Sequence, residues 1–497
     1  MNARHLSLAC LMLLAGCGAP APTPVSPTVP PSAPPSASKA PDPEAFRVTP
    51  PKPGAHPAVV FPTPQQKTLQ NGVTLFVLPK PSAITTLSVV VRHGGGSVPL
   101  GKSGLAALTA RMLTEATQRY SSLALAEATE SLGSGLDEDA GRDESHVSLS
   151  TLTADVPRGL ELLSQVVFTP AFHPADFARV KDEWLDGLRS ERQEPARLAS
   201  LAALRTLLGP VAGAPVSGSI PDVEKLSVAD LVAFHRRVYV PSNLAVIAVG
   251  NVTLDGIAPD VERLFGHVTG PAFPAPTATV APEQPSKLRV LIVDRKDSVQ
   301  SAIFAVQPFP KRSEPGFEAR DILGTLLGGL FTSRLNLNLR EKHAYTYGVH
   351  GQVLGARQWG AFFVASDVKT ETTADSLFEI LTELERAKDP TRGAPIQDQE
   401  AGRARTDLMH SLGARLEHTS SMADALRTAF AQGLPSDYYA KYPALVARIP
   451  TSEVVEQAKR LEPQRLLVII VGDRSKIEPS LKQHGFEVEI ASPTLVE

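Results

Sequence analysis

The alternation of apolar and polar positions predicts a repeated α+β arrangement beyond residue 58. Residues 66–80 hold two strand-like runs around Asn71-Gly72, a dipeptide typical of a hairpin turn. The patterns that follow predict a buried strand and glycine-rich turn (84–98), a helix (103–117), a strand (144–156), a helix (157–168), one long amphipathic helix (176–208), a helix end with a buried strand (234–252) and a helix ending at Phe265.

The second half of the chain repeats this order after a proline-rich break at residues 270–285. It begins with strands at 288–293 and 301–306 and a helix at 317–327, and residues 463–476 match residues 241–254 at an offset of 222. A shared offset over several elements favours duplication over two unrelated domains that look alike by chance. The sequence therefore predicts two duplicated α+β domains, each a mixed sheet packed with helices. We expect them at residues 58–269 and 287–497, joined by a linker at 270–286.

The N-terminus has the features of an export signal. Arg4 precedes an apolar run at residues 6–14, which is too short to span a bilayer, and Leu14-Ala15-Gly16-Cys17 resembles a bacterial lipobox. We expect residues 1–16 to be a signal peptide and Cys17 to carry lipid; an ordinary signal peptide that contains a cysteine is the alternative. The expected location is the cell envelope, facing the periplasm or on the outer membrane, with membrane contact through the lipid anchor alone.

Composition adds three expectations. Residues 17–57 are rich in proline, alanine, serine and threonine, so they cannot bury a core and are expected to form an extended tether, or else an unstructured segment without a spacing role. The only cysteines are Cys10 and Cys17, which leaves no intrachain disulfide in a lipidated protein. The formal net charge of −3 shows no basic excess, so nucleic acid is not expected as a partner.

The helix at residues 103–117 opens with Gly-x-Ala, and in a duplicated α+β chain it resembles the insulinase, pitrilysin and mitochondrial processing peptidase family of zinc peptidases. The resemblance covers about residues 59–488 and implies the LuxS/MPP-like metallohydrolase fold. Active members carry His-x-x-Glu-His on this helix and a second glutamate on a later helix. The corresponding positions here are Ala107, Ala110, Arg111 and Gly187.

None of these four residues can bind zinc. Alanine and glycine offer no lone pair, and arginine brings a permanent positive charge. The chain is therefore expected to hold no metal cofactor, while Leu105, Leu108, Met112 and Leu113 keep an apolar helix face that predicts a packing role. The remaining histidines, His343, His350, His410 and His418 among them, have no third ligand at suitable spacing.

The second half carries Ser333-Arg334-Leu335, Leu339-Arg340-Glu341 and Tyr347-Gly348 in order. The resemblance implies that Arg340 and Tyr347, seven residues apart, bind the substrate backbone and stabilise an oxyanion. Tyr345 ranks second, because it falls at a position that is usually apolar. The glycine-rich stretch before Ser333 lacks the lysine and the spacing of a phosphate-binding loop.

With a helix that lacks the zinc ligands and an intact Arg/Tyr pair, the chain resembles the zinc-free subunit of a heterodimeric family member. The expected partners are a peptide substrate and a homologous subunit that holds zinc, and this chain alone is not expected to be a metallopeptidase. The alternative is a catalytically inactive scaffold or peptide-binding envelope lipoprotein, and a third possibility is a folding or maturation factor at the envelope.

Overall fold

The computed structural model describes residues 59–273, 281–492 and 495. The predicted signal peptide, Cys17, all of the predicted tether and part of the predicted linker lie outside the described residues. Within the described part of the chain, no helix is both long enough and apolar enough to cross a membrane.

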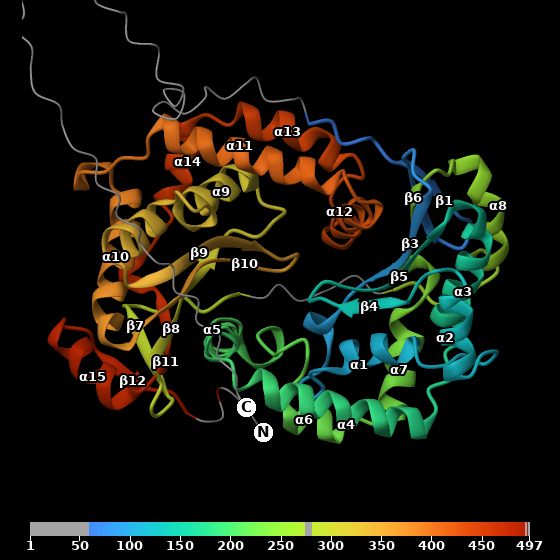
Figure 1. The fold of residues 1–497 in the computed structure, drawn as a ribbon, viewed down its shortest axis with the longest axis horizontal. Helices are drawn as coiled ribbons and strands as arrows, with labels where there is room; N and C mark the ends of the chain where they lie inside the picture. Colours follow the sequence, from blue (N-terminus) through green and yellow to red (C-terminus); the bar gives the residue numbers. More distant parts are fainter. Residues whose placement is uncertain (1–58, 274–280, 493–494, 496–497) are drawn as a thin grey trace, which may run out of the picture. The chain divides into compact units, whose positions relative to one another are not determined.

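The first half of the chain forms a six-stranded mixed sheet with the order β1-β2-β6-β3-β5-β4 (Figure 1). Its strands are β1 (Gln65–Thr68), β2 (Thr74–Pro79), β3 (Ile84–Arg92), β4 (Asp137–Ala140), β5 (Glu144–Leu152) and β6 (Leu244–Gly250). Strand β2 is parallel to β6, and all other neighbours are antiparallel. The predicted hairpin is confirmed, with Gly72 at its turn in a left-handed conformation (φ 96°) that favours glycine.

The second half forms another six-stranded mixed sheet, with the order β12-β7-β11-β8-β10-β9. Its strands are β7 (Arg289–Asp294), β8 (Gln300–Phe309), β9 (Thr346–Gly355), β10 (Gly360–Lys369), β11 (Leu467–Gly472) and β12 (Val488–Ile490). From β7 to β9 the neighbours and their directions repeat those from β2 to β4. The predicted duplication is thus confirmed at the level of sheet topology, and only the outermost strands β1 and β12 differ in direction.

The described part of the first half contains eight α-helices, which alternate with its strands along the chain. They are α1 (Leu105–Leu113), α2 (Ser122–Glu130), α3 (Val156–Phe168), α4 (Pro174–Glu191), α5 (Pro195–Ala212), α6 (Ile220–Lys225), α7 (Val228–Val238) and α8 (Leu254–Phe265). The single long helix predicted at 176–208 is wrong, because the chain breaks between α4 and α5. Glu194 adopts an extended conformation immediately before Pro195, and the proline ring disfavours a helical residue there.

The α-helices of the second half are α9 (Phe317–Gly324), α10 (Thr373–Lys388), α11 (Asp398–Arg415), α12 (Thr419–Gln432), α13 (Tyr438–Arg448), α14 (Thr451–Ala458) and α15 (Arg474–Gln483). The predicted helix at 317–327 continues past α9 as a π-helical segment, Thr325–Gly329. A second π-helical segment, Asn336–Lys342, leads towards β9.

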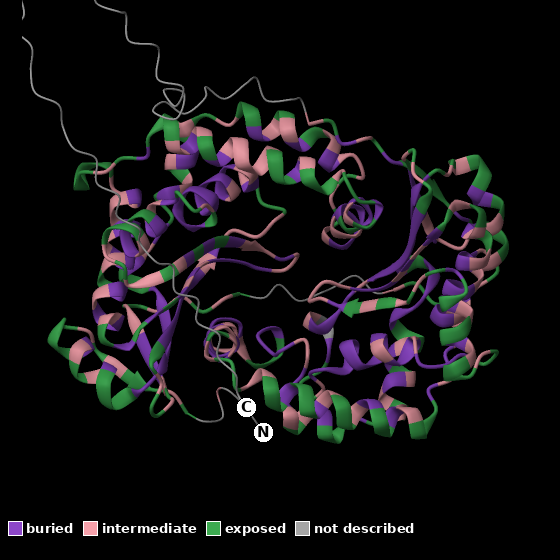
Figure 2. Ribbon diagram, in the orientation of Figure 1, coloured by how far each residue is buried: buried purple, intermediate pink, exposed green. Residues whose placement is uncertain are grey.

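Two helices pack against the sheet of the opposite half. Helix α12 contacts β3 and β6 of the first sheet, and helix α5 contacts β8 and β11 of the second (Figure 1). Successive residues of β6 alternate between two cores: Val246 belongs to a core with α3 and α8, and Ile247 to a core with α12. Figure 2 shows the central strands of both sheets as mostly buried. The halves therefore repeat one sheet topology but share their packing, and the predicted domain boundaries stay a prediction.

Candidate functional site

The first of two candidate regions lies at helix α1, which carries Ala107, Ala110 and Arg111. Gly104 begins it with φ 88°, and a Cβ there would lie 2.9 Å from Val223 Cγ2 and 3.0 Å from the Ser217 carbonyl oxygen. Glycine therefore lets the helix start against the loop before α6. The predicted apolar face of α1 is buried, and so are Ala107 and Ala110.

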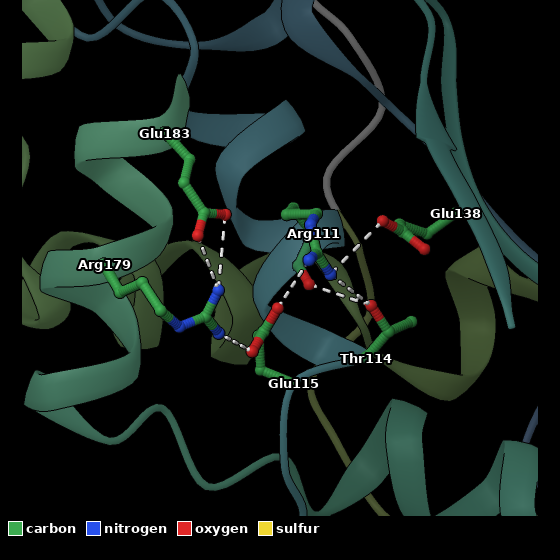
Figure 3. Close-up of polar contacts among 6 residues, drawn as sticks. All are labelled: Arg111, Thr114, Glu115, Glu138, Arg179 and Glu183. Carbon is green, nitrogen blue, oxygen red and sulfur yellow. Dashed lines mark hydrogen bonds and ion pairs between the residues drawn. The ribbon is translucent and has the colours of Figure 1, made fainter. Parts of the chain in front are cut away.

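Arg111 is held in a network of charged side chains, the α1–α4 ionic cluster (Figure 3). Its Nη2 lies 2.6 Å from Glu115 Oε1, and its Nη1 lies 3.7 Å from Glu138 of β4. Glu115 also pairs with Arg179 of α4, whose Nη1 lies 3.0 Å from Glu183 Oε1. The cluster therefore joins the end of α1 to α4 and to the edge strand β4.

Burial controls the electrostatics of this cluster. The Glu115 side chain is only 5% exposed and is shared by two guanidinium groups. Burial raises the pKa of the Glu138 carboxyl to about 7, although Arg111 acts to lower it.

The residues of this region do not fit a zinc ion. Ala107 and Ala110 lack donor atoms, and the guanidinium of Arg111 supplies a fixed positive charge where a dication would bind. Nothing lies within 4 Å of a Cβ placed on Gly187, so this position lacks a ligand for want of a side chain and not for want of space. Among the described residues, no group of three or more His, Cys, Asp or Glu side chains could hold a metal ion.

Sequence reasoning missed most of the α1–α4 ionic cluster. The pairs Arg111–Glu115 and Arg179–Glu183 both have the i,i+4 spacing at which helical side chains meet, and this signal was readable. The link between Glu115 and Arg179 joins residues 64 apart, which only the fold brings together.

The second region is built around Arg340 and Tyr347. Arg340 lies on the π-helical segment Asn336–Lys342, and Tyr347 lies near the start of β9. The buried Asn336 side chain fixes the two elements to each other: its Nδ2 donates to the Val349 carbonyl at 2.9 Å, and its Oδ1 accepts from the Val349 amide at 2.9 Å. Ala344, with φ 53°, makes the turn between them.

Arg340 and Tyr347 line the same pocket, which has a volume of about 590 Å³. Tyr347 is 91% exposed, and its hydroxyl has no hydrogen-bond partner among the described residues. The Arg340 guanidinium carbon lies 3.9 Å from the ring centroid of Phe331, and its Nε lies 3.6 Å from Glu341. Both residues therefore present hydrogen-bond donors that are not taken up by the fold.

The structure separates the two regions predicted from sequence. None of Ala107, Ala110, Arg111 and Gly187 lines the pocket of Arg340 and Tyr347. One residue of the first half, Ala196 at the start of α5, does line it.

Two aromatic residues near the pocket differ in their roles. Tyr345, ranked second from sequence, stacks on His343 with ring centroids 4.9 Å apart and does not line the pocket. Phe331 does line it, and sequence reasoning missed this residue because no spacing rule relates it to Arg340.

The comparisons with known proteins agree with this description. A family model described as "Insulinase (Peptidase family M16)" matches residues 76–207, and one described as "Peptidase M16 inactive domain" matches residues 225–406. The chain is 29% identical over 379 residues to an uncharacterized zinc protease of Mycobacterium tuberculosis, which covers 75% of this chain and 84% of the relative. It is 24% identical over 371 residues to an uncharacterized zinc protease of Streptomyces coelicolor, which covers 73% and 80%.

Two solved structures share the fold. A peptidase M16 inactive domain from Pseudomonas fluorescens superposes with a TM-score of 0.75 at 22% identity, over 82% of this chain and 98% of the other. A protease from Helicobacter pylori superposes with a TM-score of 0.77 at 17% identity, over 83% and 99%. With both family models matched in order and the paired sheets in place, the chain belongs to the insulinase family of peptidases, family M16.

Proposed function

We propose that this peptidase-like chain is the zinc-free subunit of a two-chain zinc peptidase, anchored in the cell envelope by lipid on Cys17. The observation that carries the proposal is that Arg340 and Tyr347 share one pocket and both keep free donors. A homologous partner subunit supplies the zinc, the catalytic water and the base, and the substrate is a peptide.

The two donors have distinct tasks in this proposal. Arg340 is permanently charged and offers several N–H groups, so it holds a backbone carbonyl of the bound peptide. The Tyr347 hydroxyl rotates freely and donates to the oxygen that becomes negative as the peptide bond is attacked. Removing one such donor from an oxyanion site typically slows catalysis about 100- to 1000-fold.

The α1–α4 ionic cluster supports the division of labour between two chains. Glu115 and Arg179 tie α1 to α4 through side chains, so a bound ion is not needed to connect the two helices. A chain that keeps α1 folded in this way retains the shape of the family while leaving the metal to its partner.

The test is a peptidase assay with a fluorogenic peptide and added zinc. It compares this chain alone, a family member from the same genome that keeps His-x-x-Glu-His alone, and the two mixed. We expect activity from the mixture at least tenfold above either chain alone, which is about 1.4 kcal/mol of transition-state stabilisation. Activity of this chain alone would contradict the proposal.

The alternative function is a catalytically inactive scaffold or peptide-binding lipoprotein. The absence of a metal-binding group among the described residues is equally compatible with it. If the two chains form a stable complex that cleaves no peptide, the scaffold replaces the peptidase subunit.

A further inference from the structure

Arg340 is arranged as an anion receptor. Its guanidinium carbon lies 3.9 Å from the centroid of the Phe331 ring, a cation–π contact that leaves the N–H groups at the edge of the guanidinium free. Its one ion-pair contact among the described residues is with the neighbouring Glu341, at 3.6 Å, which is too long for a hydrogen bond. Arg340 thus has Glu341 as a counter-ion but keeps its N–H donors available to a ligand.

Phe331 is one of the exposed large apolar side chains of the described residues. It is 61% exposed and lines the pocket beside Arg340, so its ring does not contribute to the buried core. Its ring contacts the guanidinium of Arg340. Phe331 is therefore a positioning residue for the guanidinium.

The remaining pocket lining favours an anion over a cation. Among the described lining residues, Asp367 is the one carboxylic acid. Burial raises the pKa of its carboxyl, and the Glu194 carboxylate adds to this, while His350 acts to lower it. The Asp367 side chain is nevertheless exposed, so solvent screens its charge and it opposes an incoming anion weakly.

We propose that the pocket formed by Phe331, Arg340 and Tyr347 binds a carboxylate group of a peptide, and that it does so on this chain alone. A carboxylate accepts two N–H bonds from the edge of one guanidinium, and the Tyr347 hydroxyl supplies a further donor. The proposal deepens the proposed function, on which it rests for the peptide nature of the ligand. A bound carboxylate uses the same two donors as the backbone carbonyl and the oxyanion of the proposed reaction, so it occupies the pocket in place of them and not together with them. The carboxylate comes either from the C-terminus of the peptide or from an acidic side chain.

The test is fluorescence anisotropy with three labelled peptides of one parent sequence and the full chain. The first peptide has a free C-terminal carboxylate, the second a C-terminal amide, and the third a C-terminal amide with one internal glutamate. We expect the amide without glutamate to bind at least about tenfold more weakly than one or both of the others, because it lacks the charge-assisted hydrogen bonds. The stronger binder of the remaining two identifies the source of the carboxylate.

Variants separate the roles of the pocket residues. Arg340→Ala should remove the difference between acid and amide, and Phe331→Leu should reduce it about threefold or more by freeing the guanidinium. Lys342→Ala is the matched control, since it removes a positive charge from the same π-helical segment without lining this pocket. Asp367→Asn should tighten binding of the acid, a gain that partial unfolding cannot produce.

Three results overturn the inference: equal affinity for all three peptides, no measurable binding of any of them, or a loss in Lys342→Ala that matches the loss in Arg340→Ala. The binding and activity experiments distinguish a failure of the carboxylate proposal from a failure of the proposed function. Carboxylate-dependent binding by a chain that gives no activity with any partner keeps the inference and removes the peptidase subunit. Activity in the mixture without carboxylate preference does the reverse.

Discussion

Glu115 joins α1 to α4 through two ion pairs, and we expect the packing of the two helices to depend on it. The substitution Glu115→Gln keeps its size and removes its charge. Glu115 is 5% exposed and pairs with both Arg111 and Arg179, whose side chains are 33% and 47% exposed. Removing one partner of a fully buried ion pair costs about 3–5 kcal/mol, but water reaches both guanidinium groups and lowers this cost. We expect a loss of about 2 kcal/mol in the free energy of unfolding, close to the value of hydrogen bonds to charged groups.

Urea-induced unfolding measures this loss, and Trp184 of α4 provides a local signal. Its indole donates a hydrogen bond to the Ser217 carbonyl at 2.7 Å, so its fluorescence reports on the packing of α4. Glu183→Gln is the matched control, because it removes a carboxylate that is 60% exposed from the same Arg179. Exposed pairs of this kind contribute under about 1 kcal/mol. If Glu115→Gln costs no more than Glu183→Gln, the cluster does not hold α1 to α4.

Three further predictions follow from the described contacts. Glu138→Gln should stabilise the protein by about 1–2 kcal/mol at pH 8 and have little effect at pH 4.5. Because the Glu138 pKa is raised in the folded state, that state binds more protons than the unfolded state between pH 4.5 and 7, and the wild type loses stability as the pH rises through this window. Urea titrations at several pH values will measure the difference. Asn336→Ala should lower the free energy of unfolding by about 2–3 kcal/mol, because it leaves the buried amide and carbonyl of Val349 without partners, and urea titration will show less than 1 kcal/mol if this is wrong. Residues 58–269 and 287–497 expressed separately should each be unfolded by circular dichroism and form a folded protein when co-expressed, because α5 and α12 cover the sheets of the opposite halves; two independently folded products would contradict this.

The fold was predictable to the extent that it follows local patterns. The Asn71-Gly72 hairpin, the buried strands β6 and β11 and the repeat between them are encoded by turn residues and by continuous apolar runs. The break at Pro195 was also encoded locally, but it was missed because the apolar spacing continues across it. The packing of α5 and α12 against the sheet of the opposite half was not predictable, because the apolar face of a helix does not indicate which sheet it will contact.

The candidate site, like the fold, was predictable only where residue type or spacing carries the signal. The loss of ligands at Ala107 and Arg111 was readable from residue type alone, and the structure adds that Arg111 is paired with Glu115. The spacing of Arg340 and Tyr347 indicated a pair, and both line one pocket. The contribution of Phe331 depends on a side-chain contact across a turn, which has no periodic signature.

We propose that Arg340 and Tyr347 act in trans on a reaction whose metal belongs to another chain. The most direct measurement is kcat/KM of the mixed chains on a fluorogenic peptide, with this chain as wild type and as Tyr347→Phe, at equal partner concentration and equal measured complex formation. We predict a fall of about 100-fold in kcat/KM, carried mainly by kcat, because the phenol donates to charge that develops only in the transition state. An unchanged kcat/KM in a complex that forms normally would contradict the claim.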